Sequence, residues 1–174
     1  MSKLTIVING KGGVGKDTLC LSLTQHRVRN ISSITPIKEI AALHGWNGEK
    51  DLKSRRFLAE LKRVFTEYND LPGRYLVEQY RAFLDSEDDI LFVHIREPEQ
   101  IAAFVESVKG DCLTLLVRRE LPETAQGYGN HADDDVEQYP YDLFFDNNRP
   151  LEQSTQAFAA LIDELLQKEQ ATQK

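Results

Sequence analysis

The segment that decides the fold runs from Leu4 to Thr18 and reads LTIVINGKGGVGKDT. Its first five residues are apolar or β-branched, which is typical of a buried parallel strand. Gly10, Gly15 and Lys16 follow with the spacing G-x-x-x-x-G-K, and helical spacing begins near Lys16. A strand, a glycine-rich turn and a helix in this order predict a loop that binds the phosphates of a nucleotide.

The residue types in this loop explain how it would hold an anion. Glycines let the backbone curl until its N–H groups point inward, and the start of a helix adds partial positive charge. Lys16 supplies an ammonium group for the β- and γ-phosphates. A glycine-rich turn without a ligand is the alternative. We expect ATP to be bound by Gly10, Lys11, Gly12, Gly13, Val14, Gly15, Lys16, Asp17 and Thr18.

The residue after the loop lysine departs from the usual motif. A Ser or Thr is expected there, because its hydroxyl ligates Mg²⁺. This chain has Asp17 instead, with Thr18 next. A carboxylate is also a hard oxygen ligand, so we expect Asp17 to bind Mg²⁺ directly or through water. The alternative is an acid that only complements the helix dipole.

The rest of the chain alternates strand patterns with helix patterns. Further strands are expected over residues 31–35, 89–95, 112–117 and 141–145. Helices are expected over residues 16–28, 36–43, 51–68, 74–84, 98–109 and 150–168. This alternation predicts a three-layer α/β fold, in which a five-stranded parallel sheet carries helices on both faces. Ligands of such sheets bind at the carboxyl ends of the strands.

Length, charge and cysteine content limit the class of protein. A chain of 174 residues fits a single domain over residues 1–174. The net charge of −7 argues against a nucleic-acid-binding surface. Without a membrane-spanning apolar run or a signal peptide, we expect a cytoplasmic protein with neither membrane nor nucleic-acid partner. Cys20 and Cys112 form no motif and are expected to be reduced core thiols. The oligomeric state stays open.

One resemblance points to a nucleotide switch. Residues 11–16, Lys-Gly-Gly-Val-Gly-Lys, resemble the deviant loop of partition and nitrogenase-reductase-type ATPases. In that family an early lysine, here Lys11, reaches across a dimer. The family has Thr or Ser where Asp17 stands, and an Asp-rich switch segment that this sequence lacks. A dimerising nucleotide-switch ATPase is therefore the alternative function.

A second resemblance covers more of the chain. Residues 15–18, Gly-Lys-Asp-Thr, resemble the loop of deoxynucleoside monophosphate kinases and animal-type phosphomevalonate kinase, within the nucleoside monophosphate kinase-like family. Residues 36–39 resemble the start of that family's acceptor-binding helices, and residues 141–148 its final strand and the turn near adenine. Residues 93–96 resemble a strand end of the form Asp-x-Arg, with His94 in place of Asp.

This resemblance implies a P-loop kinase with a helical acceptor-binding insertion at about 36–86 and a lid at about 118–140. It implies ATP and Mg²⁺ as cofactors and phosphoryl transfer to a small phosphorylated acceptor, with a nucleoside or deoxynucleoside monophosphate as the leading candidate. A non-nucleotide acceptor remains the second enzymatic alternative.

The transition state of such a transfer carries charge on the phosphoryl oxygens, so cations are needed around it. The cations expected to act in catalysis are Lys16, Arg96, Arg118 and Arg119. Those expected to bind the acceptor are Lys38, Arg55, Arg56 and Arg96, and Asn147 is expected near the adenine. A buried structural ion pair is the alternative for Arg96, and a satisfied strand-end histidine is the alternative for His94. Five basic residues lie on the helix over 51–68, and we expect most of them to form a solvated face: Lys53, Arg55, Arg56, Lys62 and Arg63.

Overall fold

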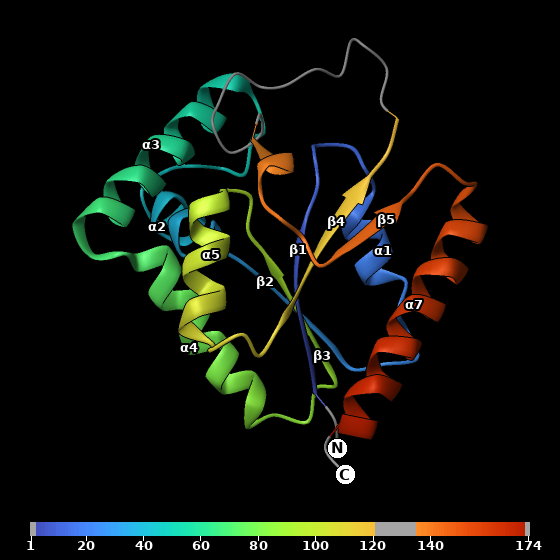
Figure 1. Cartoon of the computed structure of the whole chain (residues 1–174). Helices are drawn as coiled ribbons and strands as arrows, with labels where there is room; N and C mark the ends of the chain where they lie inside the picture. Colours follow the sequence, from blue (N-terminus) through green and yellow to red (C-terminus); the bar gives the residue numbers. More distant parts are fainter. Residues whose placement is uncertain (1–2, 121–134, 173–174) are drawn as a thin grey trace.

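The computed structural model describes residues 3–120 and 135–172. Within them, five parallel strands form one sheet in the order β2-β3-β1-β4-β5 (Figure 1). The strands are β1 Leu4–Asn9, β2 Val28–Ser32, β3 Ile90–His94, β4 Leu113–Arg118 and β5 Leu143–Asp146. The apolar residues of β1 are buried on both faces, so this strand takes the centre between β3 and β4. It therefore delivers the glycine-rich loop to the middle of the sheet's carboxyl edge.

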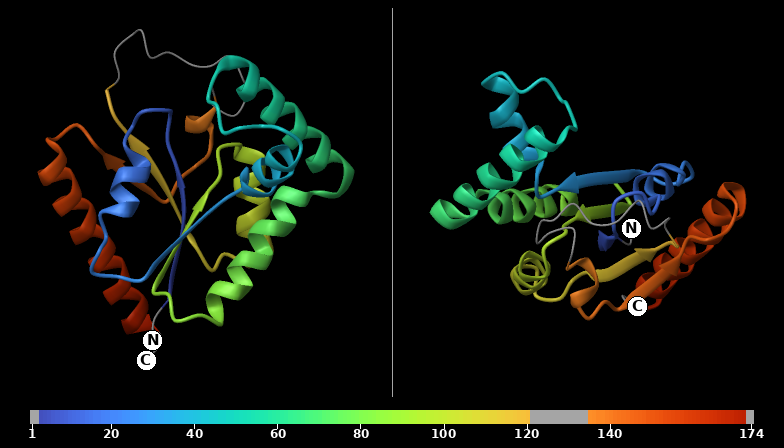
Figure 2. Two further views of the ribbon diagram at one scale, coloured as in Figure 1. Left: turned by 180° about the vertical axis from the view of Figure 1, so that it is seen from behind. Right: turned by 90° about the horizontal axis from the view of Figure 1, so that it is seen from above.

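Helices cover both faces of the sheet (Figure 2). They are α1 Lys16–Leu21, α2 Thr35–Leu43, α3 Leu52–Asn69, α4 Leu71–Leu84, α5 Pro98–Ser107, the 3-10 turn η2 Val136–Gln138, and α7 Leu151–Thr172. Side chains of β1 alternate between the faces: Ile6 packs with Leu19 of α1 and Phe158 of α7, and Val7 packs with Phe104 of α5. The three-layer α/β fold predicted from the sequence is confirmed.

Three helices separate β2 from β3, where the sequence predicts an insertion over residues 36–86. Ile37 and Ala41 of α2 and Leu58 of α3 form a small core of their own. The helix α4 belongs to the main body, because Leu76 and Phe83 pack under the sheet. The acceptor-binding role of this segment stays a prediction.

The first helix and the second strand lie earlier in the chain than expected. The helix α1 ends at Leu21 rather than Val28, because the Ser22 hydroxyl donates to the Leu19 carbonyl and the chain turns. The strand β2 then pairs with β3 from Val28 to Ser32, rather than over residues 31–35. The turn predicted over residues 69–73 is also shorter. Asp70 alone breaks the helix in a left-handed conformation (φ 50°), and its carboxylate accepts from the Gly73 N–H at the start of α4.

Two further expectations concern the surface and the thiols. Of the lid predicted over residues 118–140, residues 121–134 lie outside the described part. No helix in the described part is long and apolar enough to cross a bilayer.

Cys20 and Cys112 are free, and burial raises the pKa of each thiol to about 12. Neither is therefore a reactive thiolate at neutral pH.

Candidate phosphate-binding site

The loop between β1 and α1 has space only for glycine at two of its motif positions. A Cβ atom on Gly10 would lie 2.7 Å from Val14 Cγ2 and 2.8 Å from the Val117 carbonyl oxygen. Gly15 has a φ of +84°, and a Cβ atom there would lie 2.6 Å from Asn147 Nδ2. The close contacts leave no room for a Cβ atom at Gly10. At Gly15 the positive φ, which residues with a side chain rarely adopt, adds to the close contact, so the loop requires glycine at both positions.

Asn9 stabilises the loop through hydrogen bonds, a role that was not predicted from the sequence. It is fully buried at the end of β1, and its Oδ1 accepts from the Gly10 N–H at 2.9 Å. Its Nδ2 donates to the Arg96 carbonyl at 3.0 Å and to the Tyr141 hydroxyl at 2.8 Å. A polar residue ending an otherwise apolar strand was the available signal. Asn9 thus joins the loop to the segments that follow β3 and precede β5.

Asn147 braces the loop from the other side. It follows β5, is buried, and donates from Nδ2 to the Val14 carbonyl at 2.7 Å. Its side chain therefore contacts the phosphate loop itself. A contact with adenine, expected from the resemblance, stays a prediction.

Lys16 lies inside the loop while its neighbour Asp17 faces solvent. Their side chains are 13% and 80% exposed, and Lys16 Nζ lies 3.6 Å from Asp17 Oδ1. Burial lowers the pKa of Lys16; the Asp17 charge opposes this shift and the Arg96 charge adds to it. A buried ammonium group near a guanidinium group is strongly stabilised when a polyanion binds between them. A phosphate-binding site requires this property.

His94 occupies the end of β3, beside Ile8 of β1. Its Nε2 lies 2.9 Å from Asn30 Oδ1, and its Nδ1 lies 3.8 Å from Asp17 Oδ1. Burial lowers the pKa of His94 to about 4, with Lys16 acting in the same direction. The imidazole is therefore neutral at pH 7, at a position where the resembled kinases have a carboxylate.

The residues around Lys16 suit a divalent cation that arrives with a nucleotide. Asp17 offers an exposed carboxylate, and Thr18 is likewise exposed. The described residues hold no group of three or more His, Cys, Asp or Glu side chains that could bind a metal ion unaided. Phosphate oxygens would have to complete the coordination shell, as they usually do for Mg²⁺.

The predicted catalytic arginines occupy three different settings. Arg96 follows β3, and its charge lowers the pKa values of Lys16, His94 and Lys62, so it lies among them. Arg118 ends β4 and is paired with Asp146 of β5 through Nε at 2.9 Å and Nη2 at 3.2 Å. Arg119 is exposed to solvent. Their action on phosphate stays a prediction for all three.

The basic residues of the insertion also separate into exposed and buried groups. Lys38 and Arg56 are exposed, and Arg55 donates from Nε to the Lys50 carbonyl at 2.9 Å. Lys62 is the exception to the solvated face expected for most basic residues of this helix, since it is 8% exposed.

Lys62 is held by groups far away in the sequence. Its Nζ lies 2.7 Å from both carboxylate oxygens of Glu97 and 2.8 Å from the Ser33 hydroxyl. Burial lowers the pKa of Lys62, and Glu97 opposes the shift. The signal in the sequence was its helical spacing from Leu58, which places it on the apolar face of α3.

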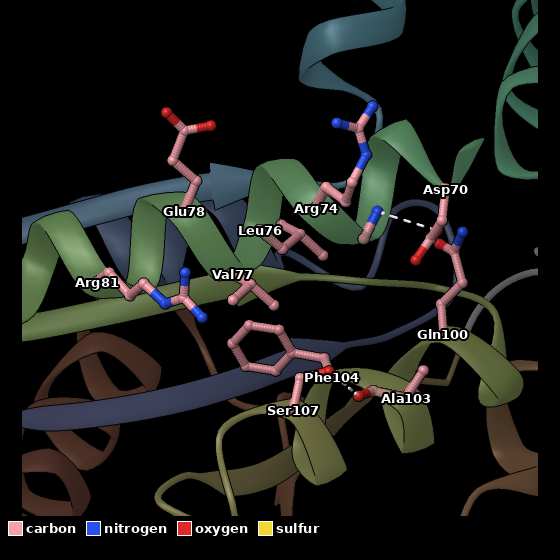
Figure 3. A pocket seen from close by; sticks show the side chains of 11 residues that line it. Asp70, Arg74, Leu76, Val77, Glu78, Arg81, Gln100, Ala103, Phe104 and Ser107 are labelled. Atoms are coloured by element: carbon pink, nitrogen blue, oxygen red, sulfur yellow. Dashed lines mark hydrogen bonds between the residues drawn. The ribbon is translucent and has the colours of Figure 1, made fainter.

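A groove of about 380 Å³ lies between α4 and α5, away from the phosphate loop. Figure 3 shows the side chains of Leu76, Val77 and Phe104 gathered between the two helices. Gln100 also lines it, and the Oε1 atom of this residue is buried without a hydrogen-bond partner among the described residues. No residue of the predicted site belongs to this groove.

The central strand, the glycine-rich loop and its buried lysine lie in a three-layer α/β fold that solved structures share. No family model and no curated protein matches the sequence. Among solved structures, the chain is similar to a gluconokinase from Sinorhizobium meliloti, with a TM-score of 0.56 and 13% identity over 98% of each chain. It is also similar to the APS kinase CysC of Mycobacterium tuberculosis in complex with AMPPNP and APS (TM-score 0.55, 12% identity, 93% of this chain and 98% of that one). A tunicamycin resistance protein of Deinococcus radiodurans has a TM-score of 0.55 and 15% identity over 92% of this chain and 95% of its own. Identities this low establish the shared fold.

Proposed function

We propose that the protein is an ATP-dependent kinase that transfers a phosphoryl group to a small phosphorylated acceptor, in the first place a nucleoside or deoxynucleoside monophosphate. The observation that carries the proposal is the desolvated Lys16 within a braced glycine loop, with the Arg96 charge beside it. The solved kinases with this fold, one of them in complex with AMPPNP, support ATP as the donor.

The chemistry required of the protein is positioning and charge stabilisation, without a covalent intermediate. Lys16 and the loop amides would hold the β- and γ-phosphates. Asp17 would hold Mg²⁺, and the ion would supply positive charge to the phosphates. Arg96 would neutralise charge between donor and acceptor, and Arg118 or Arg119 would assist from β4.

The acceptor would lie between the phosphate loop and the helical insertion, near Lys38, Arg55 and Arg56. The Lys62–Glu97 pair supports this arrangement, because it fixes α3 to the segment that carries Arg96. A non-nucleotide hydroxyl acceptor is the second candidate, since one of the similar solved structures is a gluconokinase.

The switch ATPase is disfavoured by the sequence of the loop. Asp17 stands where the partition-type family has Thr or Ser, and the sequence has no Asp-rich switch segment. We therefore favour phosphoryl transfer to a second substrate over a switch that signals by forming a dimer.

The test is a panel of nucleoside monophosphates, deoxynucleoside monophosphates, sugars and sugar acids with ATP and Mg²⁺. Release of ADP and phosphorylation of each acceptor are scored separately. We expect at least one monophosphate to be phosphorylated, with ADP release matching it mole for mole. Phosphorylation only of a sugar or sugar acid would move the assignment to the second candidate. ADP release without any phosphorylated acceptor would contradict the kinase.

A further inference from the structure

The side chains of His94 and Asp17 lie next to each other near Lys16, but they are not hydrogen-bonded. His94 Nδ1 and Asp17 Oδ1 are 3.8 Å apart, beyond hydrogen-bond distance. Bonds from a divalent ion to nitrogen or oxygen ligands measure about 2.0–2.2 Å, so two ligands of one ion lie at most about 4.4 Å apart. The observed separation is within that limit.

The contact on the opposite side of the imidazole decides which nitrogen carries the proton. Asn30 Oδ1 is an amide carbonyl oxygen and can only accept, so His94 Nε2 at 2.9 Å must donate to it. In the neutral imidazole the lone pair is then on Nδ1, the atom nearest Asp17. Ligating histidines characteristically donate their second N–H to such an oxygen, which orients the ring.

We propose that Asp17 Oδ1 and His94 Nδ1 together ligate the divalent cation of the bound nucleotide, and that the imidazole shifts the preference of the site from Mg²⁺ toward a first-row transition ion such as Mn²⁺ or Co²⁺. The inference rests on the proposed function, because phosphate oxygens must supply the remaining ligands. Mg²⁺ is bound chiefly by oxygen ligands, whereas imidazole nitrogen favours transition metals.

Lys16 competes for Asp17 in the absence of nucleotide, since its Nζ lies 3.6 Å from Asp17 Oδ1. The lysine of this motif reaches the β- and γ-phosphates when a nucleotide binds, and this movement frees the carboxylate for a cation. The metal site should therefore form only with nucleotide present. This agrees with the lack of a self-sufficient metal cluster among the described residues.

The direct test is electron paramagnetic resonance of Mn²⁺ bound with a non-hydrolysable ATP analogue, in protein carrying ¹⁵N-labelled histidine. The label separates a histidine ligand from the nitrogens of adenine. We expect ¹⁵N coupling to Mn²⁺ in the wild type and its loss in His94→Gln. His26→Gln is the matched control, because His26 contacts Asp163 and should leave the coupling intact.

Affinities give a second readout that does not require turnover. Calorimetry of the ATP analogue with Mn²⁺ and with Mg²⁺ yields the metal preference of each variant. His94→Asp should reduce the Mn²⁺-over-Mg²⁺ preference about tenfold, and Asn30→Ala should weaken Mn²⁺ binding about 10- to 100-fold by releasing the ring.

The outcomes separate the metal site from the kinase proposal. Nucleotide binding without ¹⁵N coupling, or a metal preference unchanged in His94→Asp, would overturn the imidazole ligand and leave the kinase standing. No nucleotide binding with any metal would overturn both.

Discussion

Lys16 and Asp17 are consecutive, yet one side chain turns into the phosphate loop and the other into solvent. The contrast arises because Gly15 enters α1 from a left-handed conformation, which directs the next side chain inward. Desolvating Lys16 lowers its pKa and so costs free energy in the empty protein. Such a cost is expected at a site whose ligand supplies the missing negative charge.

Lys16→Ala should abolish detectable ATP binding while the protein stays folded, because alanine removes a desolvated charge and leaves Asn9 and Asn147 to hold the loop. Calorimetry with ATP and circular dichroism measure the two properties. Lys168→Ala is the control: its exposed ion pair with Glu164 lies within α7 and should contribute little, so ATP affinity should stay within a few-fold of wild type. Wild-type affinity in Lys16→Ala would contradict the assigned role.

Asp17→Asn should weaken Mg²⁺-dependent nucleotide binding at least tenfold and leave Mg²⁺-free binding nearly unchanged, since the amide keeps the shape but loses the charge that a hard cation prefers. The measurement is nucleotide affinity with Mg²⁺ and with EDTA. Equal losses under both conditions would show instead that Asp17 only caps the helix.

Sequence reasoning identified the residues of the motif but missed most of those that support it. Lys16 and Gly15 are recognisable because their spacing is local. Asn9 and Asn30 act through contacts with Arg96, Tyr141 and His94, which are remote in sequence. Local patterns carry no record of such contacts, so these roles required the structure.

Lys62 of α3 makes a buried interaction with Glu97, which immediately precedes α5, and with Ser33, which follows β2. A buried pair costs desolvation, and removing one partner leaves an unpaired charge inside the protein. The pair therefore makes the position of the insertion depend strongly on both residues.

Glu97→Ala should lower the free energy of unfolding by about 3–5 kcal/mol, because it leaves the buried Lys62 ammonium group without its carboxylate partner. Urea unfolding measures the change. Lys62→Ala combined with Glu97→Ala should cost less than the sum of the two single changes. Arg63→Ala, on the same helix but in an exposed pair with Glu60 and Glu67, should leave the unfolding midpoint close to wild type.

The helices and strands themselves were largely predictable, since strongly periodic segments such as α3 and β3 determine their own type. The errors fell where periodicity is weak. Between Ser22 and Arg27, Leu23 keeps the helical spacing from Leu19 and the other residues are polar, so nothing in the pattern revealed that α1 ends and the chain turns toward β2. The single-residue break at Asp70 depended on a left-handed backbone that no local pattern identifies.

The sheet order brings the ends of β1, β3 and β4 next to one another, so residues from remote parts of the chain share one edge. The parallel sheet followed from the sequence pattern, but the strand order did not, because it depends on how the helices pack. This order places the Arg96 segment against Asn9 at the base of the loop. The backbone carbonyl of Arg96 accepts this hydrogen bond, so replacing the side chain keeps the acceptor in place.

Arg96→Ala should therefore reduce the rate of phosphoryl transfer about 10²- to 10³-fold while ATP affinity changes only a few-fold, because the guanidinium is needed most when charge develops in the transition state. Single-turnover transfer to the acceptor and ATP titration measure the two effects. Arg96→Lys, which keeps the charge, should recover part of the rate. One result would contradict the kinase. In it, ATP hydrolysis per molecule increases with protein concentration in the wild type, and the only effect of Arg96→Ala is to abolish this increase. Arg96 would then act in a dimer contact, and the switch ATPase would replace the kinase. In a kinase, hydrolysis without acceptor should be slow and independent of protein concentration, because the site requires a second substrate rather than a second copy of the chain.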